Sequence, residues 1–201
     1  IQYLDWIEHP GANWIRKQDY AGPYSPKKYV YYKSQENSLT DGSSWTRGYA
    51  TMNYNIMRFA DVLLMAAEAE IEAGSLAKAL EYVNLVRARA ANKAGFVMKG
   101  GVAEANYDIA LYTSFADKTA ATKAVRMERL LELATEGHRF FDLVRWGIDV
   151  PTLNAYLAYE SKTLVTKFGG ATYQATDKYL PIPQQQIDIQ GTAVLKQNPG
   201  Y

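Results

Sequence analysis

The segment NIMRFADVLLMAAEAEIEAGSLAKALEYVNLVRARAA, residues 55 to 91, decides the fold of this chain. In its first half, apolar side chains recur every three or four residues and Gly74 follows as a helix terminator, so the sequence predicts a helix from Asn55 to Ala73. The side chains of that helix predicted to face a core are Ile56, Phe59, Leu63, Ala66, Ala67 and Ile71.

A second helix is predicted directly after the first one. Ser75 is a favourable N-cap residue, and the residues that then share one helix face are Leu76, Ala79, Leu80, Val83, Val86 and Ala90. Two helices joined by so short a turn must lie antiparallel and side by side. The pair has the size of a tetratricopeptide unit, about 34 residues.

Helical spacing returns in VRMERLLELATEGHRFFDLVRWG, Val125 to Gly147. Gly137 interrupts this pattern, which predicts a left-handed corner between two helices. Trp146 continues the apolar face of the second of these helices, so it is predicted to lie in the core. Pro151 suits the first turn of a further helix.

The same segment alternates acids with arginines at three- and four-residue spacing. Such charges pair along one helix face, and a planar guanidinium can satisfy a carboxylate with two parallel hydrogen bonds. The predicted pairs are Arg129 with Glu132 and Glu136, and Arg139 with Asp142. We interpret these charges as structural.

The predicted fold is therefore mainly α, with a tetratricopeptide-like helix pair, long irregular loops and at most a few short strands. One domain, residues 1–201, is divided into an aromatic-rich irregular segment (1–54), the helix pair (55–91), a variable excursion (92–121), a helical part (122–160) and an extended C-terminal segment (161–201). Within these parts we expect a strand at Lys28–Lys33, a short helix near Asp108–Ala116 and a single turn after Pro183.

Charge and composition exclude several classes of function. The chain carries 22 basic and 21 acidic residues, so no strong field would gather nucleic acid, and no nucleic-acid partner is expected. No apolar run reaches the roughly 18 to 20 residues of a membrane-spanning helix. Because there is no initiator Met, Ile1 is interpreted as an internal start.

Neither a metal site nor a catalytic motif is predicted. The chain has no cysteine and two histidines, and although Glu132, Glu136 and His138 are close enough to converge, neighbouring arginines compete for the carboxylates. The spacing signatures of hydrolases, dinucleotide-binding proteins, P-loop proteins and zincins are absent from the sequence. We expect no catalytic residue, no metal and no cofactor.

The aromatic-rich stretch, residues 1–54, is the candidate for ligand binding. It holds three of the four tryptophans and eight of the sixteen tyrosines, among Gly, Asn, Ser, Lys and Arg. Aromatic faces suit the apolar face of a pyranose ring, and the polar neighbours can bond its hydroxyls. The alternative is that these rings fasten irregular backbone to the helical body. The predicted ligand-binding residues are Trp6, Trp14, Tyr20, Tyr24 and Trp45.

Several segments, in this order, resemble one protein family: RFADVLLMAAEAE with ALEYVNLVRARA, then VRMERLLELATEGHRFFDLVRWG, then YLPIPQQQID and LKQNPGY. They are similar to the closing half of SusD/RagB-type outer-membrane nutrient-binding lipoproteins, over residues 52 to 201. The resemblance implies a helical fold and a surface-exposed outer-membrane protein whose lipid anchor is not in this chain. It also implies that ligand residues come from variable loops.

The function implied by the resemblance is capture of an oligosaccharide, or of another nutrient such as a peptide, and its delivery to a SusC-like TonB-dependent transporter. One alternative is a structural or protein-interaction segment that contacts the transporter or a missing N-terminal half and binds no sugar. A glycoside hydrolase or lyase is a further alternative, for which the sequence offers no motif.

Overall fold

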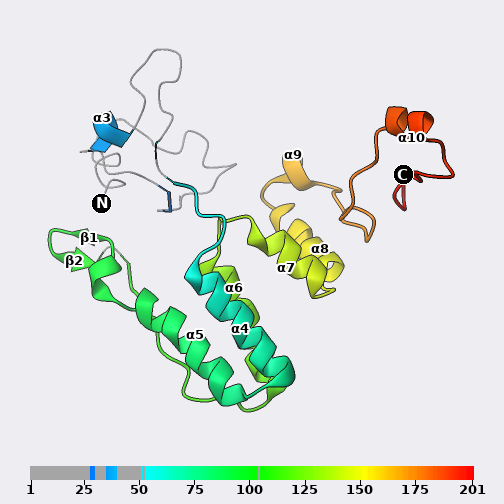
Figure 1. The fold of residues 1–201 in the computed structure, drawn as a ribbon. Coiled ribbons are helices and arrows are strands. Elements are labelled where there is room, and N and C mark those ends of the chain that lie inside the picture. The colour runs from blue at the N-terminus through cyan, green and yellow to red at the C-terminus, as the bar shows by residue number, and fades with distance from the viewer. Residues whose placement is uncertain (1–27, 30–34, 40–50, 52, 104) are drawn as a thin grey trace. The chain divides into compact units, whose positions relative to one another are not determined.

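The computed structural model describes residues 28–29, 35–39, 51, 53–103 and 105–201. Helices dominate these residues, which confirms the predicted mainly α fold (Figure 1). The chain divides into two compact units, Ile1–Gly137 and His138–Tyr201. The elements of the first unit are α3 (Glu36–Leu39), α4 (Phe59–Ala73), α5 (Leu76–Ala90), the 3₁₀ helix η2 (Lys93–Gly95), β1 (Met98–Lys99), β2 (Val102–Ala103) and α6 (Lys118–Glu132). Those of the second unit are α7 (His138–Arg145), α8 (Asp149–Glu160), α9 (Val165–Phe168) and α10 (Gln184–Gln190).

The predicted helix pair is confirmed as α4 and α5. Helix α4 ends at Ala73 before Gly74, as expected, but it starts at Phe59 instead of Asn55. The reason is Arg58, whose backbone is extended (φ −118°, ψ 155°) and whose carbonyl accepts from the first amides of the helix. Ile56 and Phe59, which were predicted to face the core, are therefore exposed.

Helices α4, α5 and α6 pack around one core. Its largest fully buried side chains are Leu64, Val83 and Val125, one from each helix. Leu64 replaces the predicted Leu63, which is only partly buried. Alanines without exposed surface lie between these side chains and let the helices approach closely: Ala67, Ala79 and Ala121.

The turn between α4 and α5 is closed by a side chain of α4. Ser75 occupies the predicted N-cap position, but its hydroxyl makes no capping hydrogen bond. The Glu70 carboxylate instead accepts a hydrogen bond from the Ser75 amide at 2.9 Å. An acidic side chain thus satisfies a free amide at the start of α5, where negative charge is favourable.

Helix α6 buries two charged side chains and exposes two leucines, although its apolar Val125 is fully buried. Glu128 and Arg129 are buried, whereas Leu130 and Leu131 are exposed. Arg129 pairs with Asp61 of α4 at 2.7 Å, and Glu128 pairs with Arg87 of α5. The predicted pairing of Arg129 within its own segment is wrong, because its guanidinium reaches a carboxylate on the neighbouring helix instead.

The predicted helix near Asp108–Ala116 is also wrong, since this segment contains no helix. Backbone groups of this segment form hydrogen bonds with side chains of α5, and not with one another as they would in a helix. The Asn84 amide donates to the Tyr112 carbonyl at 2.9 Å and accepts from the Tyr112 amide at 3.0 Å, and Arg87 Nε donates to the Ala110 carbonyl. Asn84 thereby satisfies both backbone groups of Tyr112, as a neighbouring strand would do in a sheet.

The second unit repeats this arrangement. Asn154 of α8 donates to the Tyr173 carbonyl at 2.8 Å and accepts from the Tyr173 amide at 2.9 Å. The Tyr173 hydroxyl donates to Asp149 Oδ2 at 3.0 Å, and burial together with this carboxylate raises the pKa of Tyr173 to about 12. Likewise, Gln197 binds both backbone groups of Ile182.

Two further predictions need correction in this unit, and one needs an addition. Trp146 is only half-buried, and the guanidinium groups of Arg145 and Arg139 lie 4.9 and 5.8 Å from its ring centre. The carboxylate of Asp142 accepts from Arg145 Nε at 2.9 Å, a partner that was not predicted, and the predicted partner Arg139 also interacts electrostatically with Asp142. The turn after Pro183 is a longer helix, α10, because Gln184–Gln190 continues for seven residues.

The expected strand at Lys28–Lys33 does not begin as predicted. Lys28 and Tyr29 form a turn, and Tyr29 has a φ of 58°, which lies in the left-handed region and not in the strand region. The remainder of that strand lies outside the described residues. Gly137, by contrast, has the expected left-handed backbone, with a φ of 82°.

We predict that Asp61→Ala lowers the free energy of unfolding by about 3–5 kcal/mol, because it leaves the buried Arg129 guanidinium without its carboxylate. The two side chains are only 4% and 5% exposed. Urea unfolding followed by circular dichroism measures the loss. The double change Asp61→Leu with Arg129→Met should recover much of it.

The control is Lys118→Met, which breaks an exposed ion pair with Glu72 between the same two helices. It should cost no more than about 1 kcal/mol. Equal losses of unfolding free energy in Asp61→Ala and Lys118→Met would show that the buried ion pair stabilises the fold no more than the exposed one.

Candidate functional site

The predicted ligand-binding residues Trp6, Trp14, Tyr20, Tyr24 and Trp45 lie outside the described residues. They remain predictions. The parts of the aromatic-rich stretch that the structure does describe are its turn at residues 28–29, residues 35–39 with α3, residue 51, and its end at residues 53–54. Two of its tyrosines, Tyr29 and Tyr54, therefore show how this stretch meets the helical body.

Tyr29 and Tyr54 form a stacked pair. Their ring centres lie 5.1 Å apart with an angle of 30° between the planes. Tyr54 is 63% exposed, whereas Tyr29 is half-buried. The pair is thus an aromatic surface on the first unit, contributed by two segments that are far apart in the sequence.

Lys28 holds the first of these segments against the end of α6. Its ammonium group donates to the carbonyls of Glu132 and Ala134 at 2.6 and 3.0 Å, and to Glu136 Oε1 at 2.5 Å. The last carbonyls of a helix lack intrahelical partners, and a cation is favourable there. Lys28 therefore caps the C-terminus of α6 from a position 104 residues earlier in the chain.

Arg58 holds the second segment at the same place. Its Nε and one terminal nitrogen bind the two oxygens of Glu136 at 2.8 and 2.7 Å, and its other terminal nitrogen binds Glu132 Oε1 at 2.8 Å. Arg89 of α5 completes the group by binding Glu132 Oε2 at 2.5 Å. We call these five residues the α6-end network: Lys28, Arg58, Arg89, Glu132 and Glu136.

The α6-end network changes the pKa values of two of its members, Glu136 and Arg58. Burial alone would raise the pKa of Glu136, but hydrogen bonds from Arg58 and Lys28 outweigh it and hold that pKa below its usual range. The same bonds, chiefly the one to Glu136, raise the pKa of Arg58. Both shifts favour the charged forms of Glu136 and Arg58.

Sequence reasoning missed the roles of Lys28 and Arg58. The expectation that cationic side chains occupy Glu132 and Glu136 is correct. The arginines expected there were Arg129 and Arg139, whereas the structure has Arg58 and Lys28. No local spacing could have identified Lys28, because its partners lie in another element.

The variable excursion offers a second aromatic pair. Phe96 and Tyr107 stack with ring centres 3.9 Å apart, and the Tyr107 hydroxyl accepts from the Val97 amide at 3.0 Å. The β1–β2 hairpin follows Val97 and turns through Gly100 and Gly101, both with positive φ. Figure 1 shows this hairpin at the far end of α5 from the α4–α5 turn.

Candidate metal ligands do not cluster in the part of the chain that is described. Within it, no three His, Asp or Glu side chains gather closely enough to hold a metal ion. The acids of the α6-end network are occupied by cations. No helix among the described residues has the length and hydropathy needed to cross a bilayer.

The sequence matches the model of the SusD family over residues 7–201. SusD-like protein P25 from Formosa agariphila is 34% identical over 140 residues, which cover 68% of this chain and 22% of that protein. SusD-like protein P2 from the same organism is 29% identical over 181 residues, which cover 89% of this chain and 30% of that protein. The chain thus spans less than a third of the length of these relatives.

The fold is similar to a solved structure as well. A crystal structure of a SusD superfamily protein from Bacteroides vulgatus superposes with a TM-score of 0.52 at 27% sequence identity. The match covers 77% of this chain and 29% of the other. Sequence and fold comparisons therefore agree.

We predict that Glu136→Gln lowers the free energy of unfolding by about 1–3 kcal/mol near pH 7, where the parent carboxylate is ionised and paired. Since the folded pKa of Glu136 lies below the unfolded one, its contribution is complete above the unfolded pKa and is lost as the pH falls. The difference between parent and variant should therefore shrink between about pH 5 and pH 3.

Urea unfolding at a series of pH values measures this difference. Glu81→Gln is the matched control, because Glu81 forms an exposed ion pair with Lys78 and should matter little at any pH. A difference for Glu136→Gln that stays constant down to pH 3 would contradict the assignment.

Proposed function

Since the chain belongs to the SusD family, we propose that it is part of a non-catalytic binding protein that captures an oligosaccharide through its aromatic-rich stretch. The observation that carries the proposal is the stacked Tyr29–Tyr54 pair, whose Tyr54 is 63% exposed where that stretch meets the helical body. An aromatic ring held open to solvent on a rigid support is what a sugar-binding surface requires.

The proposed contacts follow from the chemistry of a pyranose. Its C–H face is apolar and slightly positive, so it stacks on the electron-rich face of an aromatic ring. Its hydroxyls need hydrogen-bond partners, which Asn, Gln, Lys and Arg in the same stretch supply. The residues proposed to contact the ligand are Trp6, Trp14, Tyr20, Tyr24 and Trp45.

The proposed setting follows from family membership. The whole protein is a surface-exposed lipoprotein of the outer membrane, and it hands its ligand to a SusC-like TonB-dependent transporter. The helical body then acts as the support, and the loops supply the specificity. An oligosaccharide is preferred to a peptide because the stretch is rich in Trp and Tyr.

A second candidate is a protein-interaction segment that binds no sugar. Exposed apolar side chains on the outer faces of α4 and α6 favour it, because such patches mark protein contacts. They are Val62, Met65, Met127, Leu130 and Leu131. A glycoside hydrolase is the third candidate and has no supporting observation in the described residues.

We predict that Trp6→Ala, Trp14→Ala and Trp45→Ala each weaken oligosaccharide binding by about 1–3 kcal/mol, by analogy with the stacking of bases on aromatic side chains. Calorimetric titration with gluco-, xylo- and manno-oligosaccharides measures the affinities at matched concentrations of folded protein. Trp146→Ala is the control, since Trp146 lies in the second unit beneath two guanidinium groups. It should bind as the parent does.

A parent chain that binds none of the sugars would favour the protein-interaction segment. Incubation with the same sugars should release no new reducing ends, and their appearance would indicate a hydrolase. Parent-like affinity in all three tryptophan variants would refute their proposed role as ligand contacts.

A further inference from the structure

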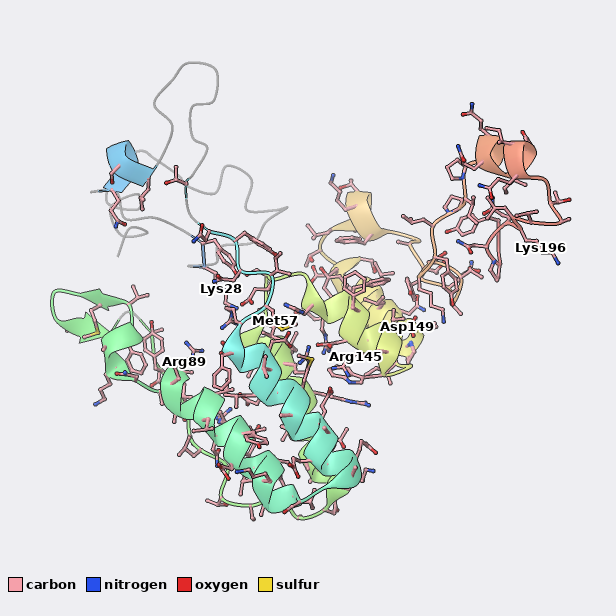
Figure 2. The ribbon with its side chains drawn as sticks, viewed as in Figure 1. Lys28, Met57, Arg89, Arg145, Asp149 and Lys196 are labelled. Carbon is pink, nitrogen blue, oxygen red and sulfur yellow. The ribbon has the colours of Figure 1, made fainter. Side chains whose placement is uncertain are left out.

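Two short segments, residues 28–29 and 54–58, are fastened to the same oxygen atoms at the end of α6. Lys28 Nζ and a terminal nitrogen of Arg58 both donate to the Glu132 carbonyl, at 2.6 and 3.0 Å. Both also donate to Glu136 Oε1, at 2.5 and 2.7 Å. Figure 2 labels Lys28 and Met57, the residue before Arg58, at this place. Two cations that share two acceptors fix the segments relative to one another.

Tyr29 is held in a costly backbone conformation. Its φ of 58° is left-handed, a backbone conformation that is rare and strained for a bulky side chain. Such a conformation persists only where its surroundings enforce it. Here the three hydrogen bonds of Lys28 act on one side of the residue, and the ring of Tyr54 stacks on its side chain.

The consequence of this arrangement is the orientation of Tyr54. The ring of Tyr29 stacks on the ring of Tyr54, and Arg58 fixes the chain four residues after Tyr54. Most of the Tyr54 side chain remains exposed to solvent. Asn53 and Asn55 are exposed on either side of it and provide amide groups that can donate to and accept from hydroxyls. A ring that is already immobilised loses little conformational entropy when a sugar stacks on it.

We propose that Tyr54, backed by Tyr29, is a preformed stacking surface for one pyranose ring of the ligand, and that Lys28 is the residue that positions it. This inference rests on the proposed function, since it names a contact of the same oligosaccharide. On this proposal the α6-end network orients a ligand contact, in addition to stabilising the first unit.

The positioning role of Lys28 is separable from the folding of the helices. When Lys28 is replaced, Glu136 keeps two hydrogen bonds from Arg58, and Glu132 keeps ion pairs with Arg58 and Arg89. No buried carboxylate is left without a cation. The Lys28 side chain is itself 35% exposed, so its loss leaves the core intact.

The test titrates four variants with the gluco-, xylo- and manno-oligosaccharide panel. Tyr54→Ala should raise Kd about fivefold to a hundredfold, as expected for a lost stacking partner. Lys28→Met should raise Kd about threefold to tenfold through lost preorganisation, with an unchanged helical melting curve. Lys28→Arg, which keeps the charge and the donors, should restore affinity. Tyr159→Ala is the matched control, because Tyr159 of α8 is 69% exposed and lies in the other unit.

Each alternative result has a definite meaning. If Tyr54→Ala binds as the parent does while the tryptophan variants lose affinity, the inference is overturned and the proposed function stands. If the parent binds no sugar of the panel, the proposed function and this inference both fail. If Lys28→Met loses helical stability, or if Lys28→Arg fails to restore affinity, the positioning role of Lys28 is overturned.

Discussion

Acidic side chains on α6 and the turn after it lie inside the first unit, and each takes a cation from another element. Glu128 is paired with Arg87 of α5, while Glu132 and Glu136 share Arg58. Leaving a buried carboxylate with no cation is costly, so these pairings disfavour alternative placements of the helices. The apolar core of α4, α5 and α6 supplies most of the burial, but it consists largely of alanines and valines that would accept a shifted register. The ion pairs specify which register is adopted.

Irregular segments are attached to this body by side chains. Amide groups of Asn84 and Asn154 bind both backbone groups of one residue each, Tyr112 and Tyr173 respectively. The aromatic-rich stretch is attached in the opposite sense, because its own Lys28 side chain donates to the carbonyls of Glu132 and Ala134 at the end of α6. The backbone amides and carbonyls of a segment outside helices and sheets need other hydrogen-bond partners. Here the side chains of Asn84 and Asn154 are such partners. The fold can thereby carry long irregular segments on a helical support.

The sequence predicted the helix pair, its antiparallel arrangement and the left-handed Gly137, because apolar periodicity and glycine are local signals. It failed where the deciding contact is remote. Leu131 has the spacing of a core residue, yet it is 59% exposed, since the inward face of α6 is taken by acids whose arginines come from other elements. The run at 108–116 was mistaken for a helix because its hydrogen bonds go to α5 side chains. Lys28 gave no local signal at all, and the predicted tryptophan contacts lie outside the described residues.

The contacts that stabilise the first unit and the surface proposed to capture the ligand lie at the same place, the end of α6. The same carboxylates that require Arg58 for folding bring residues 28–29 and 54–58 together and present Tyr54. A crystal structure of the chain with a bound oligosaccharide tests this most directly. The account predicts a pyranose ring stacked on Tyr54, with the Lys28 ammonium group bound to the Glu132 carbonyl and to Glu136. A sugar bound only to the second unit, or Lys28 turned away from α6 beside an occupied site, would contradict it.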